Sequence, residues 1–168
     1  MKTSEIDTIL HSLLEGTRVH FAGVFPRNLI PSIETLKTPS CFVSNTDESH
    51  SPGEHWVAFY IANPNRIEFF DSYGMPPSVY GFTLNVSCYN TTQYQSFDSN
   101  VCGHYCIFYL YVRSIFNSNK PLDSYFSKHN HILNDLNVRK WVKHHSKFIA
   151  PSSNCKFTCI QSCKCKNK

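Results

Sequence analysis

The chain has 168 residues, of which 41% are hydrophobic and 17% are charged, with a net charge of +4. A chain of this length is expected to form one domain with a true core, and its charge content, below the ~25% typical of globular proteins, argues against disorder. No apolar run is long enough to span a bilayer, and we expect no signal peptide because acidic residues mark the N-terminus without a following apolar stretch.

The N-terminal half predicts a helix followed by strands. Apolar residues from Ile6 to Leu14 recur at helical spacing. A proline-punctuated loop then covers residues 25–39, and Cys41–Val43 predicts a short strand. The apolar run Trp56–Ile61 predicts a central strand, and Ile67–Phe70, after a turn, predicts its antiparallel partner in a hairpin.

The C-terminal half predicts one further strand and a buried helix. Residues Tyr89–Tyr94 are rich in Tyr and Thr and predict the strand. The run that starts at Cys102 is apolar on almost all sides, so we expect a central helix there. A last helix is expected over Ile132–Phe148. The fold class is therefore α+β, a mixed or antiparallel central sheet packed on the helix that begins at Cys102.

The end of the chain is basic. Residues 1–138 contain eight Lys or Arg and twelve Asp or Glu, whereas residues 139–168 contain eight and none. Such an end can bind a polyanion, although on sequence alone a solvated terminus is the favoured explanation. We name four candidates for DNA binding: Arg139, Lys140, Lys143 and Lys147. We expect a domain over residues 1–150 and a tail without ordered structure over residues 151–168.

The eight cysteines could form disulfides, remain free thiols or bind zinc. Four lie in the domain and four in the tail. A disulfide framework requires secretion, so without a signal peptide we expect free thiols in a reducing compartment. The tail cysteines could hold zinc, but their spacing matches no established zinc motif, so we expect no metal site. The tail cysteines are Cys155, Cys159, Cys163 and Cys165.

Four residue types needed for cysteine catalysis occur in order along the chain. His55 begins one strand of the hairpin and Asp71 ends the other, so the two are expected to be neighbours. A carboxylate there can orient an imidazole that acts on a thiol. Cys102 stands at a helix N-terminus, which favours the thiolate, and the Gln95 amide could bind an oxyanion with the Cys102 N–H. Taken singly, each residue also has an ordinary structural explanation.

The same residues carry a family resemblance. The sequence is similar to the adenovirus endopeptidase (adenain) family in three blocks. These are residues 41–59, with His55-Trp56, residues 68–74, with Asp71-x-x-Gly, and Gln95 followed after six residues by Cys102-Gly103. This family is related to the SUMO-specific proteases, and the resemblance covers residues 4–148.

The resemblance implies a papain-like site in the order His55, Asp71, Gln95, Cys102. It implies a cysteine endopeptidase from a virus or virus-like element that cleaves virion precursor proteins at Gly-containing sites. The expected protein is a monomer in the virion and host nucleus, without membrane association. Activation by DNA and by a disulfide-linked viral peptide is also implied, with Cys88 as the candidate cysteine. Alternatives are a deconjugase for a ubiquitin-like modifier, or a basic non-catalytic virion component.

Overall fold

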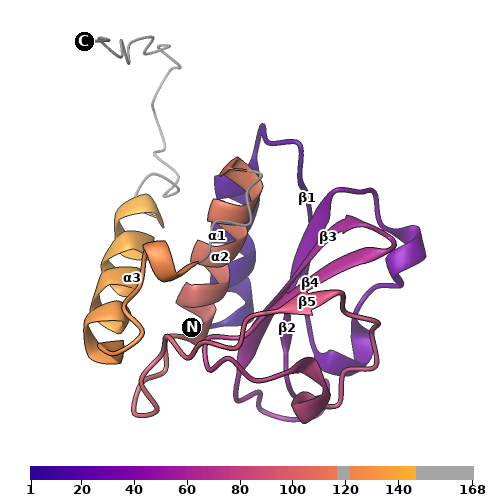
Figure 1. Cartoon of the computed structure of the whole chain (residues 1–168). Helices are drawn as coiled ribbons and strands as arrows, with labels where there is room; N and C mark the ends of the chain where they lie inside the picture. The colour runs from indigo at the N-terminus through magenta and orange to yellow at the C-terminus, as the bar shows by residue number, and fades with distance from the viewer. Residues whose placement is uncertain (117–121, 147–168) are drawn as a thin grey trace, which may run out of the picture.

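The computed structural model describes residues 1–116 and 122–146, which form a mixed sheet with helices gathered on one side (Figure 1). This architecture agrees with the expected α+β class. None of the helices in these two ranges is long and apolar enough to cross a membrane. The predicted tail, residues 151–168, and Lys147 lie outside the described residues.

Five strands form the sheet in the order β1-β2-β3-β4-β5. The three central strands are antiparallel, and each outer strand pairs in parallel with its neighbour. The predicted hairpin is confirmed as β3 and β4, with β3 at the centre of the sheet. The strands are β1 (His20–Phe25), β2 (Ser40–Asn45), β3 (Trp56–Asn63), β4 (Arg66–Phe70) and β5 (Cys88–Tyr89).

The two edge strands differ from the sequence expectations. Strand β1 was not predicted, because Gly23 interrupts its pattern with a positive φ of 127° where its register with β2 shifts. The strand predicted over Tyr89–Tyr94 is wrong in extent, since pairing ends at Tyr89. Beyond it, the Asn90 side chain bonds to the main chain of Asp71 and replaces the ladder.

Both faces of the sheet are buried, which explains the nearly continuous apolar runs of the central strands. Alternate residues of β3 enter two different cores. Ala58 and Tyr60 pack toward the helices, whereas Val57, Phe59 and Ile61 pack on the opposite face.

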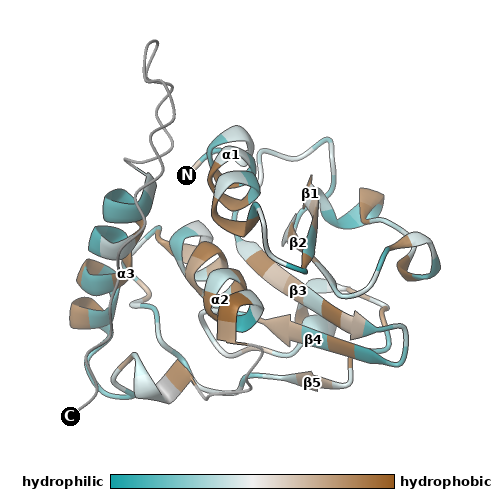
Figure 2. Cartoon of the chain, turned by 90° about the horizontal axis from the view of Figure 1, so that it is seen from above, coloured by the Kyte–Doolittle hydropathy of each residue, from teal (hydrophilic) through white to brown (hydrophobic). Residues whose placement is uncertain are grey.

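Helix α2 lies at the centre of the helical layer. It contacts α1 and α3 as well as β3, and Figure 2 shows it between the sheet and α3. Gly103 permits the approach of α1, because a Cβ there would meet the Ile6 side chain at 3.0 Å. The helices are α1 (Thr3–Leu14), α2 (Cys102–Phe116) and α3 (His131–Ser146).

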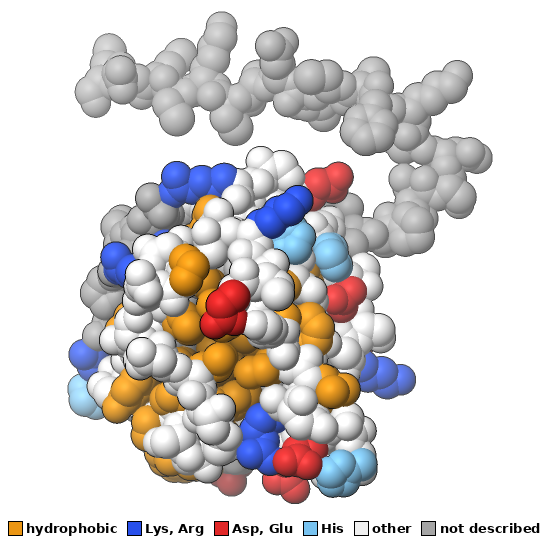
Figure 3. All heavy atoms as spheres, turned by 90° about the vertical axis from the view of Figure 1, so that its right-hand side faces the viewer, with side chains coloured by type: hydrophobic (Ala, Val, Ile, Leu, Met, Phe, Trp, Pro, Cys, Tyr) orange, Lys and Arg blue, Asp and Glu red, His pale blue; other side chains and the backbone are white. Residues whose placement is uncertain are grey.

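Loops and short 3₁₀ turns cover the other face. Ile33 and Phe82 from these segments are buried against the sheet, and Ile30, Leu36 and Leu84 pack around them. Figure 3 views the molecule from this side and shows hydrophobic side chains gathered near the middle of the surface.

Candidate active site

The β3–β4 hairpin brings His55 and Asp71 together as predicted. His55 directly precedes β3 and Asp71 directly follows β4. His55 Nε2 lies 2.6 Å from Asp71 Oδ1, and both side chains are buried. This bond fixes one ring nitrogen and leaves Nδ1 to face other groups.

The Asp71 carboxylate is held by four hydrogen bonds. One oxygen accepts from His55 and from the Tyr73 N–H at 3.2 Å. The other accepts from the Met75 N–H and from the Tyr80 hydroxyl, each at 2.9 Å. Because these donors fill the acceptor positions of a carboxylate, Asp71 has one fixed orientation toward the imidazole.

Asp71 begins a turn that only glycine can close. Gly74 has a φ of 74°, and its N–H donates to the Asp71 carbonyl at 3.0 Å. A Cβ at Gly74 would approach the backbone carbons of Thr91 and Thr92 to less than 3 Å. The Asp-x-x-Gly spacing therefore lets the chain that leads to Gln95 pass close to the turn.

Cys102 is the first residue of α2, and its side chain faces His55. The His55 imidazole and the backbone N–H groups of Trp56 and Gly103 lie close enough to the Cys102 sulfur to lower the pKa of its thiol. Since Nε2 of the ring bonds to Asp71, Nδ1 is the nitrogen available to the sulfur. Asp71, His55 and Cys102 are thus arranged in series, with the imidazole between the carboxylate and the thiol.

These contacts favour a thiolate–imidazolium pair. Burial opposes both charges, but the hydrogen bond and the charge of His55 lower the pKa of Cys102 below its usual value. Burial likewise opposes protonation of His55, yet its bonds to Asp71 and Cys102 raise the pKa of the imidazole to about 9. A nucleophilic cysteine needs this electrostatic environment.

The other cysteines of the described ranges contrast with Cys102. All four cysteines of these ranges, Cys102 included, are free thiols. Burial raises the pKa of Cys41, Cys88 and Cys106, so their thiols stay protonated at neutral pH. Cys102 is therefore the cysteine of residues 1–116 and 122–146 whose surroundings favour the thiolate.

Gln95 lies in the site but differs from the sequence expectation in the direction of its amide. Its Oε1 accepts from the Ser72 hydroxyl at 2.7 Å, and its Nε2 donates to the Ser99 carbonyl at 2.8 Å and to the Tyr73 hydroxyl at 3.1 Å. Both N–H groups are thus engaged within the protein. The side chain is fully buried and has one orientation.

Tyr73 is a member of the site that the sequence reasoning missed. Its ring stacks on the His55 imidazole, with centroids 4.9 Å apart, and the exposed Phe97 stacks at 5.6 Å. The β3–β4 register contained the signal. Ala58 pairs with Phe70, so three further residues in each direction bring Tyr73 opposite His55.

Two polar residues of α3 hold the loop that carries Gln95. Asn134 donates to the Tyr94 carbonyl at 3.1 Å, and Asp135 accepts from the Ser96 N–H at 3.2 Å. Asp135 also accepts from the Tyr105 hydroxyl at 2.9 Å, which connects the loop to α2. The site therefore depends on all three of β4, α2 and α3.

Hollows lie on both sides of the His-Trp pair. A hollow of about 570 Å³ is lined by His55, Tyr80 and the loop before β3. A second, of about 230 Å³, is lined by Trp56, Phe25 and the same loop. These surfaces give an extended chain room to approach His55, whereas Cys102 itself is only 7% exposed.

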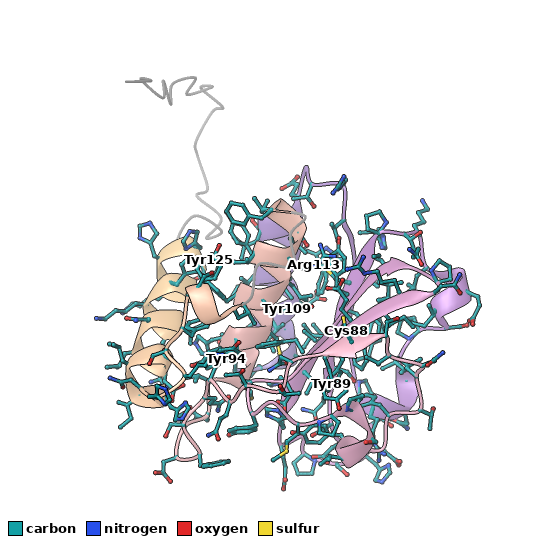
Figure 4. The ribbon with its side chains drawn as sticks, in the orientation of Figure 1. Cys88, Tyr89, Tyr94, Tyr109, Arg113 and Tyr125 are labelled. Carbon is teal, nitrogen blue, oxygen red and sulfur yellow. The ribbon has the colours of Figure 1, made fainter. Side chains whose placement is uncertain are left out.

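The remaining candidates lie away from this cluster. Cys88 is exposed on the edge strand β5, where Figure 4 labels it. Arg139, Lys140 and Lys143 are exposed on α3. Among the described residues, no group of three or more His, Cys, Asp or Glu is placed to hold a metal ion. The tail cysteines and Lys147 fall outside those residues.

Comparison with known proteins gives a fold and no function. No protein-family model matches the chain, and no curated protein is similar to it. Among solved structures, the chain is similar to the central domain of the uncharacterized Lpg1148 protein from Legionella pneumophila, with a TM-score of 0.54 and 17% identity. The match covers 88% of this chain and 98% of that domain. At this identity, the similarity supports the α+β fold alone.

Proposed function

We propose that the chain is a cysteine endopeptidase of the adenain-like type, with Cys102 as nucleophile, His55 as base and acid, and Asp71 as the residue that orients His55. One observation carries the proposal. Cys102 stands at a helix N-terminus beside a buried histidine that is itself hydrogen-bonded to a buried aspartate, and these surroundings lower the pKa of its thiol. A structural cysteine needs none of these partners.

The geometry supports acyl transfer in two steps. The Cys102 thiolate attacks the peptide carbonyl, and the His55 imidazolium gives its proton to the departing amine. Water then hydrolyses the thioester: His55 takes a proton from the attacking water and the Cys102 thiolate leaves, which restores the thiolate–imidazolium pair. Asp71 keeps Nδ1 of the ring toward Cys102 throughout both steps.

The narrow approach to the thiol supports cleavage after small residues. Cys102 is 7% exposed and His55 is 8% exposed, so a large side chain beside the scissile bond would collide with the walls. Glycine is the residue that best allows close backbone approach. Together with the resemblance, this favours precursor proteins cut at Gly-containing sites as substrates.

The test is hydrolysis by the wild type, Cys102→Ala and a matched control, Cys88→Ala. Substrates are a fluorogenic Gly-Gly peptide amide and a ubiquitin-like precursor, each with and without duplex DNA. We expect peptide cleavage by the wild type and by Cys88→Ala, and none by Cys102→Ala. Cleavage of the precursor alone would move the proposal to a deconjugase. Cleavage that survives Cys102→Ala would contradict the proposed nucleophile.

We also propose DNA as a partner of the basic face of α3. The exposed Arg139, Lys140 and Lys143 lie on this helix, and phosphate neutralisation there would make affinity fall steeply with salt. The double variant Arg139→Gln/Lys143→Gln should flatten the salt slope by about one unit per lost contact. Arg18→Gln/Lys37→Gln, which removes the same charge elsewhere, is the control. Equal slopes in both variants would exclude this face.

A further inference from the structure

The Gln95 amide is not free to donate to an oxyanion formed at Cys102. A tetrahedral intermediate on Cys102 needs hydrogen-bond donors for its oxygen. The Cys102 N–H is one, because the first N–H groups of a helix have no partner within it. Gln95 was the expected second donor, but its N–H groups donate to Ser99 and Tyr73.

The Tyr73 hydroxyl stands at the end of a directed hydrogen-bond chain. The Ser72 hydroxyl donates to Gln95 Oε1, and Gln95 Nε2 donates to the Tyr73 oxygen. Tyr73 therefore accepts through its oxygen and keeps its own O–H for donation. Donors in such chains polarise one another, which strengthens the final bond.

The position of the hydroxyl is fixed from two further sides. The Tyr73 ring is stacked between His55 and Phe97, and its N–H donates to Asp71. The phenol also lies within the electrostatic reach of Cys102. Burial first and then the Cys102 charge raise its pKa, so it stays protonated when the thiolate forms.

We propose that Tyr73 is a catalytic residue of this site, whose hydroxyl donates a hydrogen bond to the oxyanion formed on Cys102, and that Gln95 acts by positioning it. The inference rests on the proposed acyl-transfer function. As Cys102 Sγ bonds to the carbonyl carbon, the C=O π electrons move to oxygen, and Tyr73 and the Cys102 N–H bind that oxygen. Tyr73 transfers no proton. When the carbonyl re-forms, the amine leaves with the proton from His55.

Two reagents separate this role from that of the thiolate. Acylation of Cys102 by p-nitrophenyl acetate forms an oxyanion, whereas alkylation by iodoacetamide does not. Tyr73→Phe keeps the ring against His55 and removes only the hydroxyl. We expect acylation to slow by ~10²–10³-fold, the effect of losing one oxyanion donor, while alkylation stays within about twofold. Tyr89→Phe on the sheet edge is the control and should match the wild type in both reactions.

Gln95→Met tests the positioning role. It should slow acylation, and the double variant with Tyr73→Phe should be no slower than Tyr73→Phe alone, because both changes remove the same interaction. Additive losses would mean that Gln95 contacts the oxyanion itself and would overturn the assignment.

The remaining outcomes are also decisive. Unchanged acylation in Tyr73→Phe overturns the proposal, and faster acylation would show that the hydroxyl blocks the oxyanion position. An equal loss of alkylation would make Tyr73 a support of the thiolate, not an oxyanion donor. If neither reagent prefers Cys102 in the wild type, the proposed function fails together with this inference. If acylation behaves as expected but no peptide is cleaved, only the peptidase proposal fails.

Discussion

Two buried acid–base pairs connect the β3–β4 hairpin to α2, and they do different things. His55–Asp71 lies at the end of the hairpin, beside the start of α2. Arg113–Glu68 joins the middle of β4 to α2 eleven residues further along the helix. In both pairs the polar groups are largely hidden from water.

In the Arg113–Glu68 pair, the two charged groups bond directly to each other. The guanidinium meets the carboxylate in two bonds of 2.8 and 2.9 Å, and its carbon lies 4.1 Å from the centre of the Tyr60 ring. Figure 4 shows Arg113 and Tyr109 on neighbouring turns of α2. Such bidentate geometry fixes position, and the charge of Arg113 does not change at any ordinary pH.

In the His55–Asp71 pair, only one of the two ring nitrogens is bonded to the carboxylate. One ring nitrogen is bonded to Asp71, while the other faces Cys102, so the imidazole could exchange a proton with the thiol or with a group bound there. The difference indicates a division of labour. Arg113–Glu68 holds α2 against the hairpin, and in the proposed mechanism His55–Asp71 uses that fixed placement for proton transfer.

The largest expected effect is loss of the thiol. Cys102→Ala should abolish peptide hydrolysis, because no other described cysteine combines a lowered pKa with a histidine partner. In the wild type, a substoichiometric alkylating agent should label Cys102 first, read by mass spectrometry of the digested protein. Prior labelling of Cys41 or Cys88 with concurrent loss of activity would refute the assignment.

His55→Ala should cost nearly as much as the loss of Cys102, since nucleophile and base act as a unit. The same change should slow alkylation of Cys102 at neutral pH, because it removes the group that lowers the thiol pKa. Parallel measurements of kcat and alkylation rate check both statements. A variant that keeps fast alkylation would show that the helix N-terminus alone sustains the thiolate.

Asp71→Asn should lower kcat by up to ~10⁴-fold, less than removal of the base, because it misdirects the imidazole without removing it. It should also reduce thermal stability, since an amide nitrogen would face one of the N–H or O–H donors that now meet the carboxylate. Kinetics and a melting curve on the same sample separate the two effects. Wild-type kcat would exclude an orienting role for Asp71.

A substitution in the Arg113–Glu68 pair should lower the stability of the protein and leave its activity nearly unchanged. Glu68→Ala leaves Arg113 buried without its partner, so we expect a loss of about 3–5 kcal/mol in the free energy of unfolding. Activity per folded molecule should change little. The double variant Glu68→Met/Arg113→Met should recover much of the stability, because no unpaired charge remains. Urea unfolding checks the stability, and active-site titration normalises the rate. A stable protein with low kcat would break the division between the pairs.

The hairpin and the central helix could be predicted from sequence because each has a local pattern. Continuous apolar runs marked β3 and α2, and hairpin geometry placed His55 beside Asp71. The hydrogen bonds around Gln95 could not be predicted, because they depend on where separate segments cross. Asn90 and Asp135 reach the site from distant positions, and nothing in their neighbouring sequence distinguishes them from surface residues.

The smallest expected effect is the pH dependence of the two reactions that involve the His55–Asp71 pair. The pKa of His55 is raised to about 9, so the imidazolium persists below that pH and loses its proton above it. Peptide hydrolysis needs this proton for the departing amine and should fall about tenfold per pH unit on the alkaline side. Alkylation of Cys102 needs only the thiolate, and the lowered pKa of the thiol keeps that form present, so alkylation should not fall there. Rates of both reactions across pH 5–10.5 make the comparison, with Tyr89→Phe on the sheet edge measured alongside because this change leaves the His55–Asp71 pair intact. If peptide hydrolysis does not fall above pH 9 while circular dichroism shows that the protein is still folded, His55 is not the proton donor.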